Sequence, residues 1–579
     1  MSTALLAKAD RETEVSLPTE SLAVQTPTES TRTIGTQYLE RDVPCIVPKL
    51  PGKLVDNSTQ TDATSCLASC QTQTNQAFIE DTEQHVGTFD SPMKHQETND
   101  PDFSLSDSAS TSDSDEEVVD DYMEEKYIVF KSQLYSLLEK CPACSAPCHV
   151  SEKQRLGSFI KLERTCTNQH CEESYIWCSQ KEVNVGGKRN LPLGNIMLSA
   201  AILFSGLPIS KTLRMLQFLN IACISRRTFD THNTRYLQPA VWHVWSAHQQ
   251  ENLEEIRSRT EPLVIGADGR CDSPGHCSKF LSYSMMDLHS KKIINFQMIQ
   301  SNEVGGSTRM EVEGLERSLD LLLNRYDLPI EAIVTDRHVQ VVKLLRENYP
   351  HISHFFDVWH VAKGLVKKLE QLSKRKECVD IHPWIKSIAN HLYWCASSSD
   401  GRSELVVAKW QSLINHICNK HRHENPHFPE CLHGDIEERL WLEEGTAACE
   451  MLRDLLYKTR FMSDISKLSP HHQTSSVEGF HSLIINYAPK HTGYSFRGMI
   501  TRTALAALHH NENCTRAPAV TRKGEKRYSI LFPKYKKGDP TVVAKKPDAT
   551  YGNCYLTPCK VLASSLKHLK LHIKYWLVH

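Results

Sequence analysis

Residues 261–366 alternate between strand-like and helix-like hydrophobic patterns, and this alternation constrains the fold of the chain more than any other feature. The pattern predicts strands at 261–269, 280–290, 291–300, 330–338 and 351–360, and helices at 308–326 and 339–350. Helix then follows from Val361. The order is therefore β-β-β-α-β-α-β-α, in which three meandering strands come before strands and helices that alternate. Few α/β folds begin in this way.

This order is typical of a ribonuclease-H-like (RNase H-like) mixed β-sheet core. From 361 to about 475 strand character is lost, which predicts an all-helical insertion before the last part of the core. Helix resumes at 475–489. We therefore predict an α/β fold whose RNase H-like core is interrupted by a helical insertion and preceded by a zinc ribbon and a helical segment.

The predicted domains follow from changes in composition along the chain. They are a disordered, acidic, Ser/Thr/Gln-rich tail at 1–125, a zinc-ribbon-like module at 126–185, a helical segment with a candidate helix-turn-helix at 186–255, the first part of the core at 256–366, the helical insertion at 367–468, the last part of the core at 469–515 and a basic C-terminal extension at 516–579.

Charge is distributed very unevenly along the chain. Residues 1–126 hold 8 basic and 25 acidic side chains, and residues 127–579 hold the remaining 59 basic and 44 acidic ones. A basic body behind an acidic tail favours a polyanionic partner such as double-stranded DNA. The sequence has no apolar run of 18 residues and no secretory signal pattern, so we expect no association with a membrane. We therefore also expect the 20 cysteines of the chain to lie in a reducing compartment.

Three carboxylates are the candidate catalytic residues. Asp268 closes the first strand, Asp336 closes the fourth strand, which should lie beside the first, and Glu478 lies on the helix after the insertion. Carboxylates brought together in this way can hold two Mg²⁺ or Mn²⁺ ions for phosphodiester transfer. Each Asp alone could equally be a strand-end cap or turn former.

Other carboxylates in the core compete for the same role: Asp272, Asp287, Glu303, Glu311 and Glu313. Asp272 is the strongest rival by position, but its Gly/Pro-containing surroundings favour a loop-forming role. Asp287 follows a strand and opens a hairpin turn, which also favours a structural role.

Four segments carry a resemblance to a known family: ADGRCDSPGHCSK (267–279), IVTDRH (333–338), FFDVWHVAKG (355–364) and SPHHQTSSVEGFHSLI (469–484). Over about 140–540, the chain resembles eukaryotic cut-and-paste DNA transposases with a DDE active site, in particular the hAT, Mutator and Kolobok branches. Asp357 and His360 match the Cys/Asp-x-x-His motif of these branches.

The resemblance implies that Asp268, Asp336 and Glu478 are the catalytic triad, with Asp357 and His360 as active-site or end-processing residues. It further implies DNA cleavage and strand transfer at transposon ends, DNA recombination in the nucleus, and a homo-oligomer. A domesticated, catalytically inactive DNA- or chromatin-binding protein is the alternative, and a segment after residue 554 that departs from the family pattern favours it. A generic nuclease of this fold would lack the long helical insertion.

Cysteine spacing predicts a zinc site before the core. Cys141 and Cys144 form a C-x-x-C pair, and Cys166 and Cys171 form a looser second pair, with 21 residues between the two pairs and His170 as an alternative fourth ligand. This spacing suits a zinc ribbon of structural role.

The insertion contains a second candidate zinc site, formed by His416, His423, Cys431 and His433 within a larger group of His and Cys residues. A solvent-facing His-rich helix and loop is the alternative. Three tryptophans of the insertion could stack on an exposed DNA base, but the core of the insertion is the favoured place for them: Trp384, Trp394 and Trp410.

Candidate DNA contacts lie in two basic helices. Lys363, Lys367 and Lys368 follow the fifth strand, and Arg226 and Arg227 begin a second short helix of a helix-turn-helix-like segment, capped by Ser225. An ordinary solvated helix face is the alternative for the lysines. Helical packing around a neighbouring domain explains the helix-turn-helix-like pattern almost as well.

Overall fold

The computed structural model describes residues 124–171, 173–184, 190–274, 277–434, 436, 439–470, 474–533 and 538–553. Residues 1–123 of the predicted acidic tail and residues 554–579 of the predicted C-terminal extension lie outside the described residues. Within the described part of the chain, no helix has the length and apolarity needed to cross a membrane.

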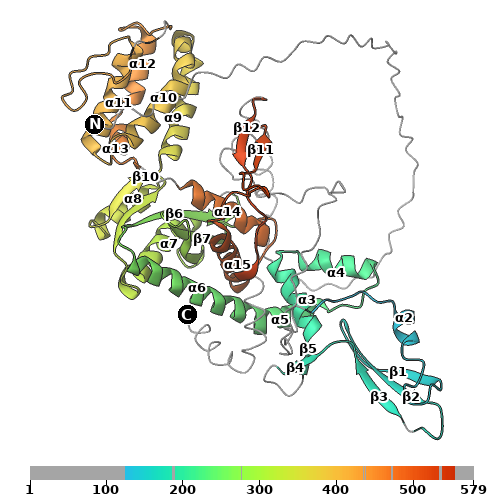
Figure 1. Cartoon of the computed structure of the whole chain (residues 1–579). Coiled ribbons are helices and arrows are strands. Elements are labelled where there is room, and N and C mark those ends of the chain that lie inside the picture. Colours follow the sequence, from blue (N-terminus) through green and yellow to red (C-terminus); the bar gives the residue numbers. More distant parts are fainter. Residues whose placement is uncertain are drawn as a thin grey trace, which may run out of the picture. The chain divides into compact units, whose positions relative to one another are not determined.

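A five-stranded mixed sheet forms the α/β core, as predicted (Figure 1). Its strands are β6 (Leu263–Cys271), β7 (Phe280–Asp287), β8 (Ile293–Gln300), β9 (Ile330–Thr335) and β10 (Ser353–Phe356). The spatial order is β10-β9-β6-β7-β8. The pairs β6–β7 and β7–β8 are antiparallel, whereas β6–β9 and β9–β10 are parallel. The expectation that the fourth strand lies beside the first is thereby confirmed.

Both faces of the sheet are buried under helices, and alternate side chains of each strand pack on opposite faces. In β6, Leu263, Ile265 and Ala267 pack on one face, under α7 (Met310–Leu319) and the helices that follow it. Those helices are a π-helix, η4 (Asp320–Arg325), and α8 (Val339–Asn348), with a short 3₁₀ turn, η3 (Ser307–Arg309), before them. A strand has a side-chain period of two, so Val264, Gly266 and Asp268 point to the opposite face.

That opposite face is covered by helices from distant parts of the chain: α3 (Leu193–Phe204), α6 (Gln238–Ser258), α14 (Ser475–Tyr487) and α15 (Phe496–Asn513). Gly266 permits the close approach of α14, because a Cβ there would lie 3.2 Å from Val477 Cγ2 and 2.7 Å from Leu288 Cδ2. The sheet therefore has one helix from beyond the insertion directly against its first strand.

Two strand ends differ from the prediction. β6 does not end at Asp268 but continues to Cys271, and its last residues pair only with β7, since pairing with β9 stops at Gly266. β10 ends at Phe356 because the Asp357 side chain accepts a hydrogen bond from the Trp359 amide and caps the next helix. His360 therefore lies on a helix, not on a strand.

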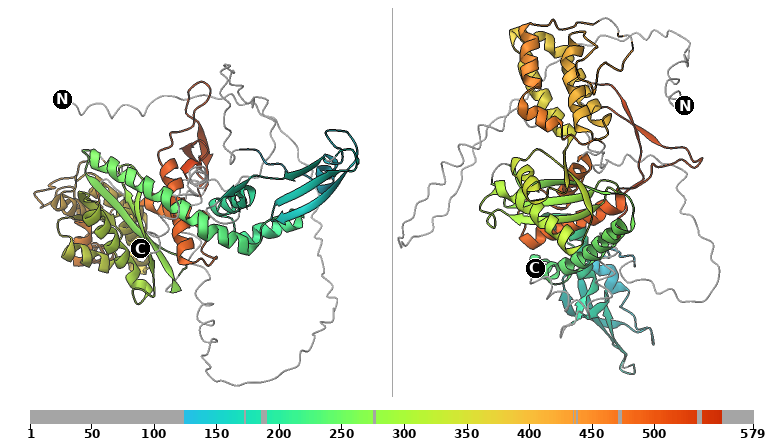
Figure 2. Two further views of the ribbon diagram at one scale, coloured as in Figure 1. Left: turned by 90° about the horizontal axis from the view of Figure 1, so that it is seen from below. Right: turned by 90° about the vertical axis from the view of Figure 1, so that its left-hand side faces the viewer.

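The insertion is a helical bundle with its own core, seen as the yellow-to-orange helices in Figure 2. Its elements are α9 (Val358–Ser373), η5 (Lys376–Trp384), α10 (Ile385–Ser397), α11 (Ser403–Ile417), α12 (Ala447–Leu456) and α13 (Thr459–Ile465). Trp384 and Trp410 are 1% and 0% exposed, and their indole N–H groups donate to Leu440 O and Leu456 O. These tryptophans belong to the core of the insertion, as the favoured interpretation predicts.

The chain enters and leaves the insertion at the same edge of the sheet. The Phe356 amide donates to Lys467 O at 2.7 Å, and the Ser469 amide donates to Phe356 O at 3.0 Å. Residues 467–469 thus extend the sheet beside β10. Arg337, directly after β9, adds an ion pair of 2.9 Å to Asp464 of α13.

Before the core lies a three-stranded antiparallel sheet with the order β1-β2-β3. Its strands are β1 (Cys148–Leu156), β2 (Phe159–Cys166) and β3 (Ser174–Cys178); a short helix, α2 (Lys131–Ser136), precedes them and a two-stranded pair, β4 (Glu182–Asn184) and β5 (Asn190–Pro192), follows. Its apolar centre is small, with Phe159 and Leu162 fully buried. A core of this size needs additional cross-links for stability.

Short helices link this module to the core: α4 (Ile209–Phe218), α5 (Arg226–His232) and the π-helix η1 (Asn233–Leu237), which runs into α6. Ser225 caps α5 by accepting a hydrogen bond from the Thr228 amide, as predicted. At the other end of the described chain, β11 (Tyr528–Leu531) pairs with β12 (Thr541–Ala544).

Candidate active site

Asp268 lies two residues beyond Gly266, where the pairing of β6 with β9 ends. Its Oδ1 accepts a hydrogen bond of 2.7 Å from the Gly269 amide, and its Oδ2 lies 3.4 Å from His481 Nδ1 of α14. His481 Nε2 lies 3.1 Å from the hydroxyl of Ser284, the partner of Asp268 on β7. α14 therefore supplies a histidine that orients the first predicted carboxylate.

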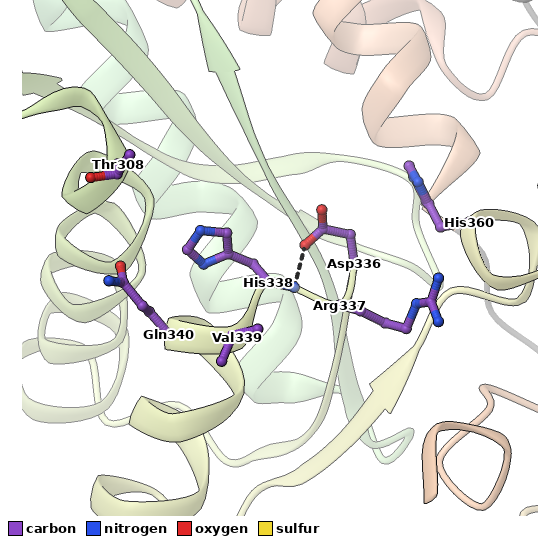
Figure 3. A pocket seen from close by; sticks show the side chains of 7 residues that line it. All are labelled: Thr308, Asp336, Arg337, His338, Val339, Gln340 and His360. Atoms are coloured by element: carbon purple, nitrogen blue, oxygen red, sulfur yellow. Dashed lines mark hydrogen bonds between the residues drawn. The ribbon is translucent and has the colours of Figure 1, made fainter. Parts of the chain in front are cut away.

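Asp336 follows β9 directly and accepts a hydrogen bond of 3.1 Å from the His338 amide. It faces a pocket of about 510 Å³, in which His338 lies on one side of it and His360 on the other (Figure 3). Burial and the negative charge of Asp268 raise the pKa of Asp336, although the His338 amide and nearby histidines oppose the shift. Asp268 and Asp336 therefore interact electrostatically in one site.

Glu478 lies in the first turn of α14 and reaches the site through His360 of α9, whose Nε2 lies 3.0 Å from Glu478 Oε1. Burial opposes protonation of His360, but the hydrogen bond to Glu478 and the charges of Asp357, Glu478 and Asp268 outweigh it and raise its pKa. His360 thus links the third predicted carboxylate to the other two.

The three carboxylates are less tightly gathered than the cysteine group described below, whose ligand atoms all lie within 4.8 Å of one another. Among the described residues, Asp268, Asp336 and Glu478 form no group of that compactness. Three like charges repel one another, and the histidines hold two of them.

Asp357 does not line the pocket but is 1% exposed. Its Oδ1 caps α9, and its Oδ2 accepts hydrogen bonds from both the amide and the hydroxyl of Thr474, the residue before α14. One buried carboxylate therefore joins the starts of the two helices that carry His360 and Glu478. Its place in the structure is a positioning one.

Glu311 is the carboxylate that sequence analysis ranked too low. It lies in the first turn of α7, where burial, with the charges of Asp336 and Asp268, raises its pKa to about 8. One turn later, Gly314 has no Cβ and permits close contact with β7, since a Cβ there would lie 2.5 Å from Tyr283 Cβ. The glycine three residues after Glu311 was the signal in the sequence that a helix approaches the sheet here.

The other rival carboxylates are structural. Asp272 Oδ1 accepts hydrogen bonds from the Ser278 hydroxyl and the Lys279 amide, and Asp287 is fully buried in an ion pair with Arg259, so the expected loop and turn roles are confirmed. Glu303 and Glu313 both bind Arg317.

The first predicted zinc site is brought together as a compact group. Cys141, Cys144, Cys166 and Cys171 place their sulfurs within 4.8 Å of one another, with 3.5 Å between Cys144 and Cys166. This four-cysteine set can bind zinc, and the alternative ligand His170 is exposed outside the group.

In the insertion, the structure gathers His416, His421, Cys431 and His433 within the same 4.8 Å limit. Three of the four predicted residues are present, and His421 stands where His423 was expected. His423 instead stacks on Phe428 and places its Nε2 3.3 Å from Cys431 Sγ. The Cys431 amide donates a hydrogen bond to His421 O, which places these two residues side by side. This set can also bind zinc.

The predicted DNA contacts are exposed and lie on two separate helices. Lys363, Lys367 and Lys368 are on the outer face of α9, and the ammonium group of Lys363 lies 4.8 Å from the centre of the Trp359 ring. Arg226 and Arg227 line a surface pocket of about 600 Å³ on α5, where Arg226 also pairs with Asp230. Both sets are available to phosphates.

No protein-family model matches this chain, and a search of curated proteins finds no match.

Proposed function

We propose that this chain is a DNA transposase or a transposase-derived enzyme with an RNase H-like core, which cleaves DNA at transposon ends and transfers the 3′ ends to target DNA. The observation that carries the proposal is the convergence of Asp268, Asp336 and Glu478, from two adjacent parallel strands and a helix beyond the insertion. The strand order β10-β9-β6-β7-β8 supports the RNase H-like assignment.

The donor set fits a hard divalent cation. Burial and the charge of Asp268 raise the pKa of Asp336, and burial with the charges of Asp336 and Asp268 raises that of Glu311. A bound cation would relieve this repulsion. Asp268, Asp336 and Glu478 would hold Mg²⁺ or Mn²⁺, since carboxylate oxygens favour these ions over zinc. A bound ion would supply activation of a water or 3′ hydroxyl and stabilisation of the leaving oxygen.

The remaining residues of the site position the carboxylates or contribute positive charge for DNA. His481 orients Asp268, and His360 orients Glu478, while Asp357 holds the two helices that carry this second pair. The exposed lysines of α9 begin one turn beyond His360 and suit the phosphates of a DNA strand that enters the pocket. The zinc ribbon and α5 would hold flanking double-stranded DNA, and the resemblance implies a nuclear homo-oligomer that pairs two ends.

The alternative function is DNA or chromatin binding without catalysis. The arginines of α5 favour it, because they form a basic surface pocket of their own and not as part of the carboxylate site. The electrostatic interaction of Asp336 with Asp268, and the contact of Glu478 with His360, favour catalysis.

The test is cleavage of DNA that carries the repeats flanking the coding sequence, with Mg²⁺ or Mn²⁺ and the full chain. Asp268→Asn should lower cleavage by about two orders of magnitude or more while DNA binding persists. Glu331→Gln, an exposed carboxylate on β9, is the matched control and should cleave normally. Salt-sensitive binding without cleavage by the unaltered chain would instead support the binding protein.

A further inference from the structure

We propose that His416, His421, Cys431 and His433 bind one structural zinc ion that holds the long loop between α11 and α12 against the insertion. This site lies outside the carboxylate centre and is independent of the proposed DNA chemistry. The described residues of 418–446 contain no helix or strand. Loops of this length in a compact domain need another constraint to hold one conformation.

The ligand set comes from two short stretches that the backbone pins together. His416 is in the last turn of α11, and Asn419, with a φ of 58°, turns the chain so that His421 comes back beside it. The Cys431 amide then donates to His421 O at 3.0 Å, which brings the second half of the set to the first. The ring centres of His416, His421 and His433 lie only 4.8 to 5.2 Å apart.

The hydrogen bonds of the imidazoles leave specific nitrogens for a metal. His421 Nε2 lies 2.9 Å from Asn419 Oδ1, whereas its Nδ1 is buried and has no hydrogen-bond partner among the described residues. His433 Nδ1 lies 2.8 Å from Gly434 O, which leaves its Nε2. Metal-binding histidines commonly donate their second N–H group to an oxygen acceptor in this way.

One thiolate and three imidazoles are ligands suited to tetrahedral zinc, and four protein ligands leave no open position for catalysis. The site is therefore structural. Trp384 and Trp441 lie beside the histidines, and the ring centres of Trp441 and His421 are 5.9 Å apart. The guanidinium carbon of Arg439 stacks 3.8 Å from the ring centre of Trp384. A zinc ion here would fix a loop that supplies buried Phe428 and Leu442 to the core of the insertion.

His423 provides an internal comparison. It lies as near to Cys431 Sγ as the proposed ligand His416 does, but its ring makes other contacts. Its ring stacks on Phe428, and its Nδ1 lies 3.4 Å from Asn415 Nδ2. The geometry thus distinguishes His421 as the ligand and His423 as a supporting residue.

The test is the zinc content of the purified full chain, measured by inductively coupled plasma mass spectrometry. We expect two zinc ions per chain, one of which is lost in His421→Ala and Cys431→Ser, the other in Cys144→Ser, and neither in His423→Ala. A single zinc in the unaltered chain, or loss in His423→Ala but not in His421→Ala, would overturn the assignment.

X-ray absorption at the zinc edge tests the same claim without any substitution, so a variant that fails to fold does not obscure the result. Two loaded sites should give five sulfur and three nitrogen ligands shared by two zinc ions, because one site has four cysteines and the other has one. A purely sulfur shell would contradict the site. Neither measurement depends on DNA cleavage, so this proposal and the proposed function can fail separately.

Discussion

At the scale of single residues, the candidate active site consists of acids that repel one another and histidines that hold them. His481 contacts Asp268, and His360 contacts Glu478, so each of these acids has a positively chargeable partner. Glu311 lies 4.0 Å from His338 Nε2, yet Glu311 and Asp336 carry raised pKa values because they are buried near other negative charges. The balance of these charges sets both the cation affinity and the pH dependence of the site.

Replacing His360 by Ala tests its positioning role. Loss of an outer partner of a metal ligand typically costs about 10- to 100-fold in activity, so we expect cleavage to fall by that factor while DNA affinity stays unchanged. His351→Ala, an exposed histidine before β10, is the control. An unchanged apparent Mg²⁺ requirement in His360→Ala would show that His360 does not act through Glu478.

Glu311 makes a pH-dependent contribution to stability. Its pKa rises from 4.5 to about 8 in the folded chain, so the folded state keeps a proton that the unfolded state releases. Stability should therefore fall as pH rises from about 4.5 to 8, by on the order of 1–4 kcal/mol. Urea unfolding at pH 5 and pH 8 without Mg²⁺ should show this loss, and Glu311→Gln should reduce it. An equal pH dependence of stability in the unaltered chain and in Glu311→Gln would exclude Glu311 as the source of that dependence.

At the scale of elements, the site depends on where helices begin. Asp357 starts α9 and also binds the residue before α14, so the two helices that carry His360 and Glu478 share one anchor. The composition of 351–360 predicted a strand through this segment, since Phe355, Phe356, Val358 and Trp359 favour strands. The capping geometry of Asp357 determined the boundary, and strand propensity could not reveal it.

Asp357→Ala should destabilise the chain by about 2–3 kcal/mol, because it removes a cap and leaves the Thr474 amide and hydroxyl without their acceptor. Ser495→Ala removes the cap of α15, where Ser495 accepts from the Gly498 amide, and should cost only about 1 kcal/mol. Chemical denaturation measures both. Equal costs, or normal cleavage by Asp357→Ala, would contradict the shared anchor.

The order of elements in the sheet was predictable, because hydrophobic period distinguishes strands from helices over whole segments. The contribution of Glu311 was harder to predict, because it arises from the close approach of α7 to β7, a tertiary contact that Gly314 alone signals in the sequence. His421 was missed for a similar reason. The spacing of cysteines and histidines limits which residues can be zinc ligands. Which of the neighbouring histidines joins the group depends on the turn at Asn419.

At the scale of the whole molecule, the insertion separates Glu478 from the two aspartates by more than 140 residues of sequence. The backbone bonds between Phe356 and residues 467–469, and the ion pair of Arg337 with Asp464, return the chain to the sheet edge that it left. The bundle can therefore be long without displacing α14 from β6. The central claim is that these distant segments together hold one divalent-cation site.

Iron-directed backbone cleavage tests this claim most directly. Fe²⁺ replaces Mg²⁺ in the full chain, and added ascorbate and peroxide cut the backbone near the bound ion. We predict cuts near 268, 336 and 478, which excess Mg²⁺ suppresses and Asp268→Asn weakens. Cuts confined to one of these segments, or cuts that excess Mg²⁺ leaves unchanged, would contradict a shared site.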